Sequence, residues 1–244
     1  MSETVRPAAD SSLELLSSGD LEILGLLPYS SNYVFLARVC SKGAEALAVY
    51  KPRRGERPLW DFPRGTLAAR EVAAFSVSKA AGWGIVPPTV MRPDAPMGLG
   101  SVQLFIQHDP ERHYFALLEE RPTEFGVFAA FDVIVNNADR KAGHILEDPD
   151  GRLWGVDHGV AFHVHEKLRT VIWHLAGQPL DAVSVDGLLR LRAVLAREQG
   201  LGGELTRLLS RKEVNATSAR VERLLSVRRL PSPGSDYDLP WPLI

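Results

Sequence analysis

Short apolar runs rich in β-branched and aromatic residues dominate the first 110 positions of the chain. Such runs, separated by turn-forming Gly, Pro, Ser and Asn, predict strands. We expect a short helix and then a strand within residues 13–27, and further strands at 33–39, 46–51 and 101–107. One helix is predicted among them, over residues 67–80, with Thr66 as its N-cap.

The remainder of the chain has mostly helical patterns. Pro122 suits the first turn of a helix, in which Phe125, Phe128 and Asp132 share one face. Three more helices are expected, at about 166–176, 185–199 and 203–228, the last broken within. A strand-rich part followed by a helix-rich part predicts an α+β fold of two lobes with a cleft between them.

The same patterns give the boundaries of the lobes. We place a loose tail at residues 1–12, a small lobe at 13–108, a helical lobe at 109–230 and a Pro-rich surface tail at 231–244. The lobes would be joined near residues 105–112, with the strand at 101–107 as the hinge.

Composition narrows the class of protein. The 244 residues suffice for a sizeable core. A net charge of −2 with interspersed signs argues against nucleic-acid binding. The single cysteine, Cys40, excludes an intramolecular disulfide and a Cys-rich zinc site. The polar N-terminus and the lack of any 18-residue apolar run predict no signal peptide and no transmembrane helix. We therefore expect a cytoplasmic protein that would meet a membrane-bound substrate only peripherally.

Two polar signatures interrupt apolar runs near mid-chain. Residues 137–144 read NADRKAGH after the run FDVIV, and residues 156–159 read VDHG after LWG. Apolar runs that end in Asp, Arg, His and Gly indicate buried elements that deliver polar groups to one cleft. A third signal is Glu71, which lies on the apolar face of the helix at 67–80 and needs a cationic partner there.

Four stretches carry a resemblance to a known family: AVYKP, SVQLFIQ, FDVIVNNADRKAGH and VDHGVAF. Together they resemble the phosphatidylinositol 3-/4-kinase-like superfamily, and most closely the pattern of type II phosphatidylinositol 4-kinases, as a divergent member of bacterial type. They stand in the family's order and span roughly residues 28–165. The resemblance implies a kinase-like fold with a β-rich, nucleotide-binding N-lobe and a helical C-lobe. It implies ATP and Mg²⁺ or Mn²⁺ as cofactors.

In this resemblance the N-lobe binds the nucleotide. Lys51 would contact the α- and β-phosphates, with Glu71 as its ion-pair partner. Backbone groups of the hinge, at Phe105 and Gln107, would contact adenine. Phosphate oxygens would also be held by a turn without the usual glycines, formed by Ser30, Ser31 and Asn32. The alternatives are a surface lysine beside a solvated glutamate, and an ordinary β-turn.

The C-lobe would carry the chemistry. Asp139 would accept the proton of the acceptor hydroxyl, as the catalytic-loop aspartate of kinases does. Arg140 would offset developing charge or steady the loop. Asp157 would bind the metal that bridges the β- and γ-phosphates. Asp132 would support the loop. The alternative is that Asp139 and Asp157 merely cap loops.

His144 departs from the family pattern, which has Asn there as second metal ligand. Imidazole suits Mn²⁺ better than Mg²⁺. His144 is therefore a metal ligand, a hydrogen-bond donor to phosphate, or the mark of an inactive site. His158 also departs from the family's Asp-Asn-Gly or Asp-Phe-Gly, and local hydrogen bonding suits it better than ligation. With His163 and His165, a metallohydrolase site is a weaker alternative that leaves Lys51 unexplained.

The predicted function is ATP- and metal-dependent phosphoryl transfer to a hydroxyl of a lipid headgroup, a protein or a small metabolite. The main alternative is a pseudokinase that keeps the fold as a nucleotide-binding or interaction module, and a further one is transfer of AMP. One loop stays outside this scheme: residues 53–65 are dense in Arg and Pro and contain Trp60, and they either meet an anionic ligand or form a solvated loop.

Overall fold

The computed structural model describes residues 9–28, 32–197 and 200–244. The chain forms two compact units. The first comprises residues up to Val72 together with Pro87–Phe105, and the second comprises Ala73–Val86 together with Ile106–Ile244. The fold class is α+β, as the sequence predicts, with an antiparallel sheet in the N-terminal region and helices in the C-terminal region.

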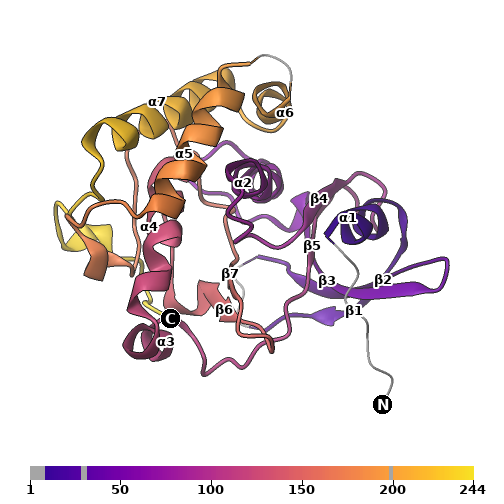
Figure 1. Ribbon diagram of the computed structural model, residues 1–244. Coiled ribbons are helices and arrows are strands. Elements are labelled where there is room, and N and C mark those ends of the chain that lie inside the picture. Colours follow the sequence, from indigo (N-terminus) through magenta and orange to yellow (C-terminus); the bar gives the residue numbers. More distant parts are fainter. Residues whose placement is uncertain (1–8, 29–31, 198–199) are drawn as a thin grey trace. The chain divides into compact units, whose positions relative to one another are not determined.

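The first unit is a five-stranded antiparallel sheet covered on one face by a helix (Figure 1). The strand order is β1-β2-β3-β5-β4. The bounds are α1 Ala9–Ser18, β1 Asp20–Leu26, β2 Phe35–Ser41, β3 Ala44–Pro52, β4 Thr89–Arg92 and β5 Gly100–Leu104. The order of helix and strands up to β3 agrees with the sequence prediction.

Alternating side chains of the sheet build the core of this unit. Val39, Tyr50 and Val102 are buried from three neighbouring strands, and Leu16 of α1 packs on them. β2 and β3 are joined by the two residues Lys42 and Gly43, both at positive φ. Such a turn matches the twist of a hairpin and fixes the register of the two strands. The hairpin thereby sets where Lys51 lies along β3.

The helix α2, Leu67–Ala81, belongs to both units. Its residues up to Val72 belong to the first unit, which contains the sheet. Ala73, Ala74 and Val77 are buried in the core of the second unit. The sequence prediction placed the whole helix in the smaller lobe. Small residues on the second half of α2 explain the difference, because they allow close packing against other helices.

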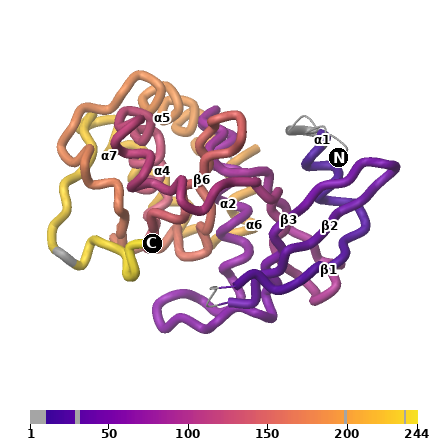
Figure 2. Tube along the Cα trace, turned by 90° about the horizontal axis from the view of Figure 1, so that it is seen from below, coloured from indigo at the N-terminus to yellow at the C-terminus, as the bar shows by residue number. Residues whose placement is uncertain are grey.

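The second unit is built mainly of helices that pack on one another. The path of the chain through them can be followed in Figure 2. Nine of the ten residues of α4 are buried. α4 packs against α5 and α7, and α6 packs against both of those. The bounds are α3 Tyr114–Glu120, α4 Gly126–Val135, α5 Ala182–Leu195, α6 Leu201–Leu208 and α7 Arg211–Val227, with a small hairpin of β6 Ile145–Glu147 and β7 Leu153–Gly155.

Of two helix predictions in this region, one is confirmed and the other is wrong. The break within 203–228 is present, because Ser210 caps α7 in a capping box with Glu213. The helix predicted at 166–176 is wrong. The chain there is irregular apart from one 3-10 turn at Trp173–Leu175, since its backbone groups bond to other loops.

Three further elements differ from the sequence prediction. The strand predicted at 101–107 ends at Leu104, and the four-residue β4 was not predicted. The Pro-rich tail is partly buried rather than only superficial. Pro240 is buried, and the carbonyl of Leu243 accepts a hydrogen bond from the backbone N–H of Ala142 at 2.8 Å. No helix in the described part of the chain is long and apolar enough to cross a membrane.

Candidate active site

The two polar signatures meet within the second unit. The first leaves the end of α4 through Asn136, whose φ of 53° turns the chain out of the helix. The second follows β7, and Asp157 also has a positive φ of 60°. A backbone hydrogen bond of 3.0 Å from Val156 to the carbonyl of His144 joins the two loops. Asn136 and Asp157 thus have left-handed backbone although neither is glycine. Such a conformation persists because the surrounding structure holds it.

A fully buried ion pair lies beneath these loops. Arg140 donates to both carboxylate oxygens of Asp132, at 3.0 Å from Nε to Oδ2 and 2.9 Å from Nη2 to Oδ1. Both side chains have no exposed surface. A buried charge pair is tolerable only when its remaining hydrogen-bond capacity is also used. Thr170 and Asn137 donate further bonds to the same carboxylate, at 3.3 and 3.0 Å.

Arg140 also reaches the second signature. Its guanidinium donates to the carbonyl of Val156 at 3.0 Å and to Nε2 of His158 at 2.6 Å. Because Arg can only donate, Nε2 of His158 is an acceptor, and its proton lies on Nδ1. His158 is buried and is a hydrogen-bonding residue of the loop. Arg140 thus ties α4 to both loops, which matches the loop-steadying role among its two predicted roles.

Asp139 lies at the partly exposed edge of this network. Its side chain is 31% exposed, and Lys141 Nζ lies 3.4 Å from its Oδ2. Its backbone N–H donates to Oδ1 of Asn137 at 3.1 Å. The pKa of Asp139 is raised to about 6, chiefly by burial and also by the nearby charge of Asp157, while the charge of Lys141 opposes the rise. A carboxylate with this pKa is a stronger proton acceptor than an ordinary aspartate.

His144 and Asp157 face each other. His144 Nε2 lies 3.4 Å from Oδ2 of Asp157, and the two side chains are 15% and 50% exposed. Nδ1 of His144 accepts a long hydrogen bond, 3.4 Å, from the backbone N–H of Lys141. A neutral imidazole that accepts at Nδ1 carries its proton on Nε2, directed here at Asp157. The structure therefore brings Asp139, His144 and Asp157 into one group of loops.

The first unit holds the predicted Lys51–Glu71 ion pair. Lys51 Nζ bonds to Oε1 of Glu71, whose side chain is only 3% exposed. The cationic partner that the buried position of Glu71 demands is thus present. Asn32 Oδ1 accepts a 2.7 Å bond from the backbone of Arg57. Ser30 and Ser31 lie outside the described residues.

The two predicted hinge residues fall on either side of the unit boundary. Phe105 is the last residue of the first unit, and its backbone N–H bonds to the carbonyl of Leu47 at 2.9 Å. Gln107 belongs to the second unit and is exposed. Their contact with adenine stays a prediction.

The HVHEK segment is held by hydrogen bonds to its backbone, and the Nδ1 of His163 accepts a 3.0 Å bond from the backbone N–H of His165. Asn136 Nδ2 donates to the carbonyls of His163 and His165, at 2.9 and 2.7 Å. Arg220 of α7 donates to the carbonyl of His163 at 2.6 Å. Within the described ranges no group of three or more His, Cys, Asp or Glu side chains is arranged to hold a metal ion. The metallohydrolase alternative gains no support from this arrangement.

Three supporting residues escaped the sequence reasoning: Asn136, Thr170 and Arg220. Asn136 holds the 163–167 segment from one side and Arg220 from the other. Thr170 follows that segment. Its backbone N–H donates to the carbonyl of Asp238, and its hydroxyl donates to the carboxylate of Asp132. An Asn directly after a long apolar helix is a recognisable left-handed cap, so the sequence offered a signal for the role of Asn136. Arg220 and Thr170 make their contacts over long sequence separations, so no local sequence pattern could reveal them.

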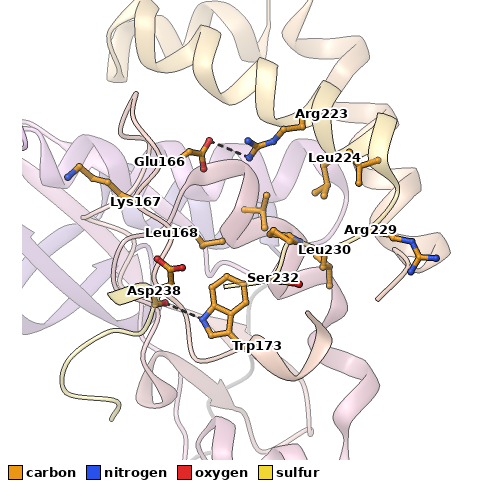
Figure 3. A pocket seen from close by; sticks show the side chains of 13 residues that line it. Glu166, Lys167, Leu168, Trp173, Arg223, Leu224, Arg229, Leu230, Ser232 and Asp238 are labelled. Atoms are coloured by element: carbon orange, nitrogen blue, oxygen red, sulfur yellow. Dashed lines mark hydrogen bonds and ion pairs between the residues drawn. The ribbon is translucent and has the colours of Figure 1, made fainter. Parts of the chain in front are cut away.

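A separate cavity of about 410 Å³ lies in the second unit (Figure 3). The Arg223–Glu166 ion pair lies at one end and Trp173, which donates to the carbonyl of Asp238, at the other. Its lining includes none of the predicted site residues. Leu168 of its wall belongs to the segment that is hydrogen-bonded to Asn136 and Asn137, so this wall also supports the loop that carries Asp139.

One comparison by sequence is decisive. The protein Rv2133c of Mycobacterium tuberculosis (strain ATCC 25618 / H37Rv) is 38% identical over 268 residues, which cover 93% of the chain and 94% of that protein. The chain belongs to the Rv2133c family. No family model matches the sequence.

Solved structures similar to this Rv2133c-family chain include proteins described as kinases. A crystal structure of the Golgi casein kinase with Mn and ADP bound has a TM-score of 0.55 at 14% identity, covering 90% of the chain and 75% of that structure. Hydra Fam20 with sugar has a TM-score of 0.57 at 14% identity, covering 90% and 87%. The Helicobacter pylori proinflammatory kinase CtkA has a TM-score of 0.52 at 9% identity, covering 88% and 94%. At these identities the likeness shows a kinase-like fold.

Proposed function

We propose that this Rv2133c-family protein transfers the γ-phosphoryl group of ATP to a hydroxyl acceptor. The observation that carries the proposal is the group Asp139, His144 and Asp157, held on loops that the buried Asp132–Arg140 pair fixes. The kinase-like fold of the neighbouring structures, one of which contains Mn and ADP, supports it. The type II phosphatidylinositol 4-kinase resemblance makes a lipid headgroup one candidate acceptor beside proteins and small metabolites.

Asp139 would act on the acceptor. An oxygen–phosphorus bond forms between the hydroxyl and the γ-phosphorus, the bond from that phosphorus to the β–γ bridging oxygen breaks, and ADP leaves. The proton of the hydroxyl passes to a carboxylate oxygen of Asp139. Its pKa of about 6 suits this role, because the group is ionised at neutral pH and still accepts a proton readily.

Asp157 and Lys51 would hold the nucleotide, each in its own unit. Asp157 is half exposed and has an oxygen donor for Mg²⁺ or Mn²⁺. Magnesium is commonly held by one or two carboxylates, with water and substrate phosphates completing its shell, so this donor set fits such an ion. The ion would neutralise charge on the phosphates. Lys51, oriented by Glu71, would contact phosphate oxygens.

His144 is better suited to hydrogen bonding than to metal ligation. Its Nδ1 is used by the backbone of Lys141, and the Nε2 proton points toward Asp157. Ligation through Nε2 would require that proton to leave. We therefore favour, of the three readings of His144, a donor that orients Asp157 or bonds a phosphate oxygen. His144 in place of Asn is also what favours the pseudokinase alternative, in which ATP binds without turnover.

Turnover and label transfer test the proposal. The full chain is incubated with γ-labelled ATP and Mg²⁺ or Mn²⁺, with candidate hydroxyl compounds and without them, and released ADP and labelled product are measured. We expect Asp139→Asn to lower turnover about 10²–10⁴-fold while ATP still binds, as loss of a general base does. Asp150→Asn, an exposed aspartate on the β6–β7 turn, is the matched control.

Three outcomes would contradict the proposal. ATP binding without ADP release from the wild type would favour the pseudokinase. Transfer of AMP, seen as a different mass gain on the product, would favour nucleotidyl transfer. Equal turnover in wild type and Asp139→Asn would remove Asp139 from the chemistry.

A further inference from the structure

The loop between β3 and α2, residues 53–66, has no role in the proposed phosphoryl transfer. We call it the arginine loop. Four of its side chains are exposed arginines, set against two acidic residues. It also carries Trp60, whose side chain is 93% exposed. The loop therefore combines a large apolar ring that is left in water with a local excess of positive charge.

The arginine loop is firmly built. Its backbone begins with a 2.8 Å hydrogen bond from Arg53 to Leu99 and is tied to Asn32 by the 2.7 Å bond from Arg57. Phe62 is buried beneath it, and the guanidinium of Arg70 lies 4.9 Å from the centre of its ring. The loop is thus a fixed platform, and Trp60 does not project from a loose chain.

A small cavity opens in this platform. Its volume is about 170 Å³, below the roughly 300 Å³ at which pockets for drug-sized molecules begin. Arg53, Arg57 and Arg64 line it, together with apolar side chains and Glu56. Glu56 Oε1 accepts a 2.9 Å bond from the backbone of Ala68 at the start of α2, so its charge is directed to the helix N-terminus. Three guanidinium groups around a small cavity match a phosphate group in size and charge.

Trp60 decides which phosphate compound fits. It follows Leu59, which lines the cavity. A soluble phosphate would need the arginines alone, whereas a membrane offers both a layer of phosphates and an interface in which indole rings are stable. Arginines are attracted to the anionic surface of a membrane, and a tryptophan is stable in its interfacial layer, so the two residue types favour the same partner. We propose that the arginine loop binds the headgroup region of anionic phospholipids, with Trp60 inserted at the interface.

Vesicle binding tests this inference, which rests on the loop alone and not on catalysis. The full chain, without ATP, is sedimented with vesicles of phosphatidylcholine with and without phosphatidylserine. We expect binding to the anionic vesicles only, weakened by salt. The double variant Arg57→Gln/Arg64→Gln should bind about 20-fold more weakly, at roughly fivefold per cation. Trp60→Ala should bind about tenfold more weakly, as partial burial of a large aromatic ring predicts.

Two controls match these variants in the second unit. Trp241→Ala removes another tryptophan, 88% exposed, and Arg211→Gln/Lys212→Gln removes two exposed cations from α7. Both should bind vesicles as the wild type does. Thermal unfolding of each variant checks that it folds. Losses confined to the arginine-loop variants support the inference.

Several results would overturn it. These are equal binding to neutral vesicles, no binding to either kind, and equal losses in the control variants. Direct binding of glycerol phosphate, measured by calorimetry, without any vesicle binding would show an anion site for soluble ligands instead. Since no nucleotide is present, failure here leaves the phosphotransferase proposal untouched, and failure of turnover leaves this one untouched.

Discussion

Two aspartates seven residues apart in the second unit have opposite physical characters. Asp132 is fully buried and is bonded to Arg140, Asn137 and Thr170. Asp139 is partly exposed, has Lys141 at 3.4 Å and has its pKa raised to about 6. The first aspartate is paired with a guanidinium and has its hydrogen-bond capacity used, so it fixes the loops. The second has a raised pKa and binds a proton more tightly than an ordinary aspartate, as the proposed proton acceptor must. The comparison separates what would position the proposed site from what would react in it.

The largest expected effect comes from breaking the buried pair. Asp132→Ala leaves Arg140 as an uncompensated charge without surface exposure, and we expect a loss of about 3–5 kcal/mol in the free energy of unfolding. Chemical denaturation monitored by circular dichroism measures it. Asp150→Ala, at an exposed turn, should change stability by less than about 0.5 kcal/mol. A loss below about 1 kcal/mol for Asp132→Ala would contradict the structural role of the pair.

At Asp139 we expect a substitution to increase the free energy of unfolding. Its pKa in the folded protein lies above the ordinary value of 3.8, so the folded state holds the proton more tightly than the unfolded state. Ionisation therefore lowers stability as pH rises from about 4 to 6, and the cost is constant above that range. Asp139→Asn should be more stable than wild type by about 1–2 kcal/mol at pH 7, a figure reduced for solvent exposure and the lost Lys141 contact.

The difference in stability between wild type and Asp139→Asn should disappear only below about pH 3, where Asp139 is protonated in both the folded and the unfolded state. Unfolding measured at about pH 3 and at about pH 7 tests both the sign and the pH window. An Asn variant that is less stable than wild type at pH 7 would contradict the picture of an aspartate strained by burial.

Activity should depend on the same ionisation. Since the carboxylate form of Asp139 accepts the proton, the rate should rise with pH through an apparent pKa of about 6 and then level off. A divalent cation near Asp157 would move that inflection lower, never higher. Rates measured from pH 4.5 to 8 test this, and the residual rate of Asp139→Asn should lack the inflection. A wild-type rate that falls as pH rises from 5 to 7 would contradict it.

The smallest effect is expected at His144. If it donates a hydrogen bond and does not bind the metal, His144→Gln should reduce turnover about tenfold or less, while the ratio of rates with Mn²⁺ and Mg²⁺ stays unchanged. Parallel assays with the two metals measure the ratio. A strong fall in Mn²⁺ preference in the Gln variant would identify His144 as a ligand instead.

The periodic parts of the fold could be predicted from sequence, because local patterns determine them. Lys51 was expected at the end of a strand and Glu71 on the apolar face of a helix, the family resemblance paired them, and the ion pair is present. The supporting role of Asp132 was also predicted, and its buried network agrees with it.

Long-range hydrogen bonds explain what could not be predicted. The backbone N–H groups of Lys167, Arg169 and Thr170 donate to Asn136, Asn137 and Asp238, so no helix forms where periodicity favoured one. The carbonyl of Leu243 meets Ala142 across a hundred residues of sequence. Such contacts satisfy backbone groups that local patterns cannot account for.

Calorimetric titration of ATP into the full chain tests the central claim most directly. It is carried out with Mg²⁺, with Mn²⁺ and with chelator, for wild type, Asp157→Ala and the control Asp150→Ala. The account predicts metal-dependent ATP binding that Asp157→Ala abolishes and Asp150→Ala retains. Absence of ATP binding by the wild type with either metal, or full binding by Asp157→Ala, would contradict it.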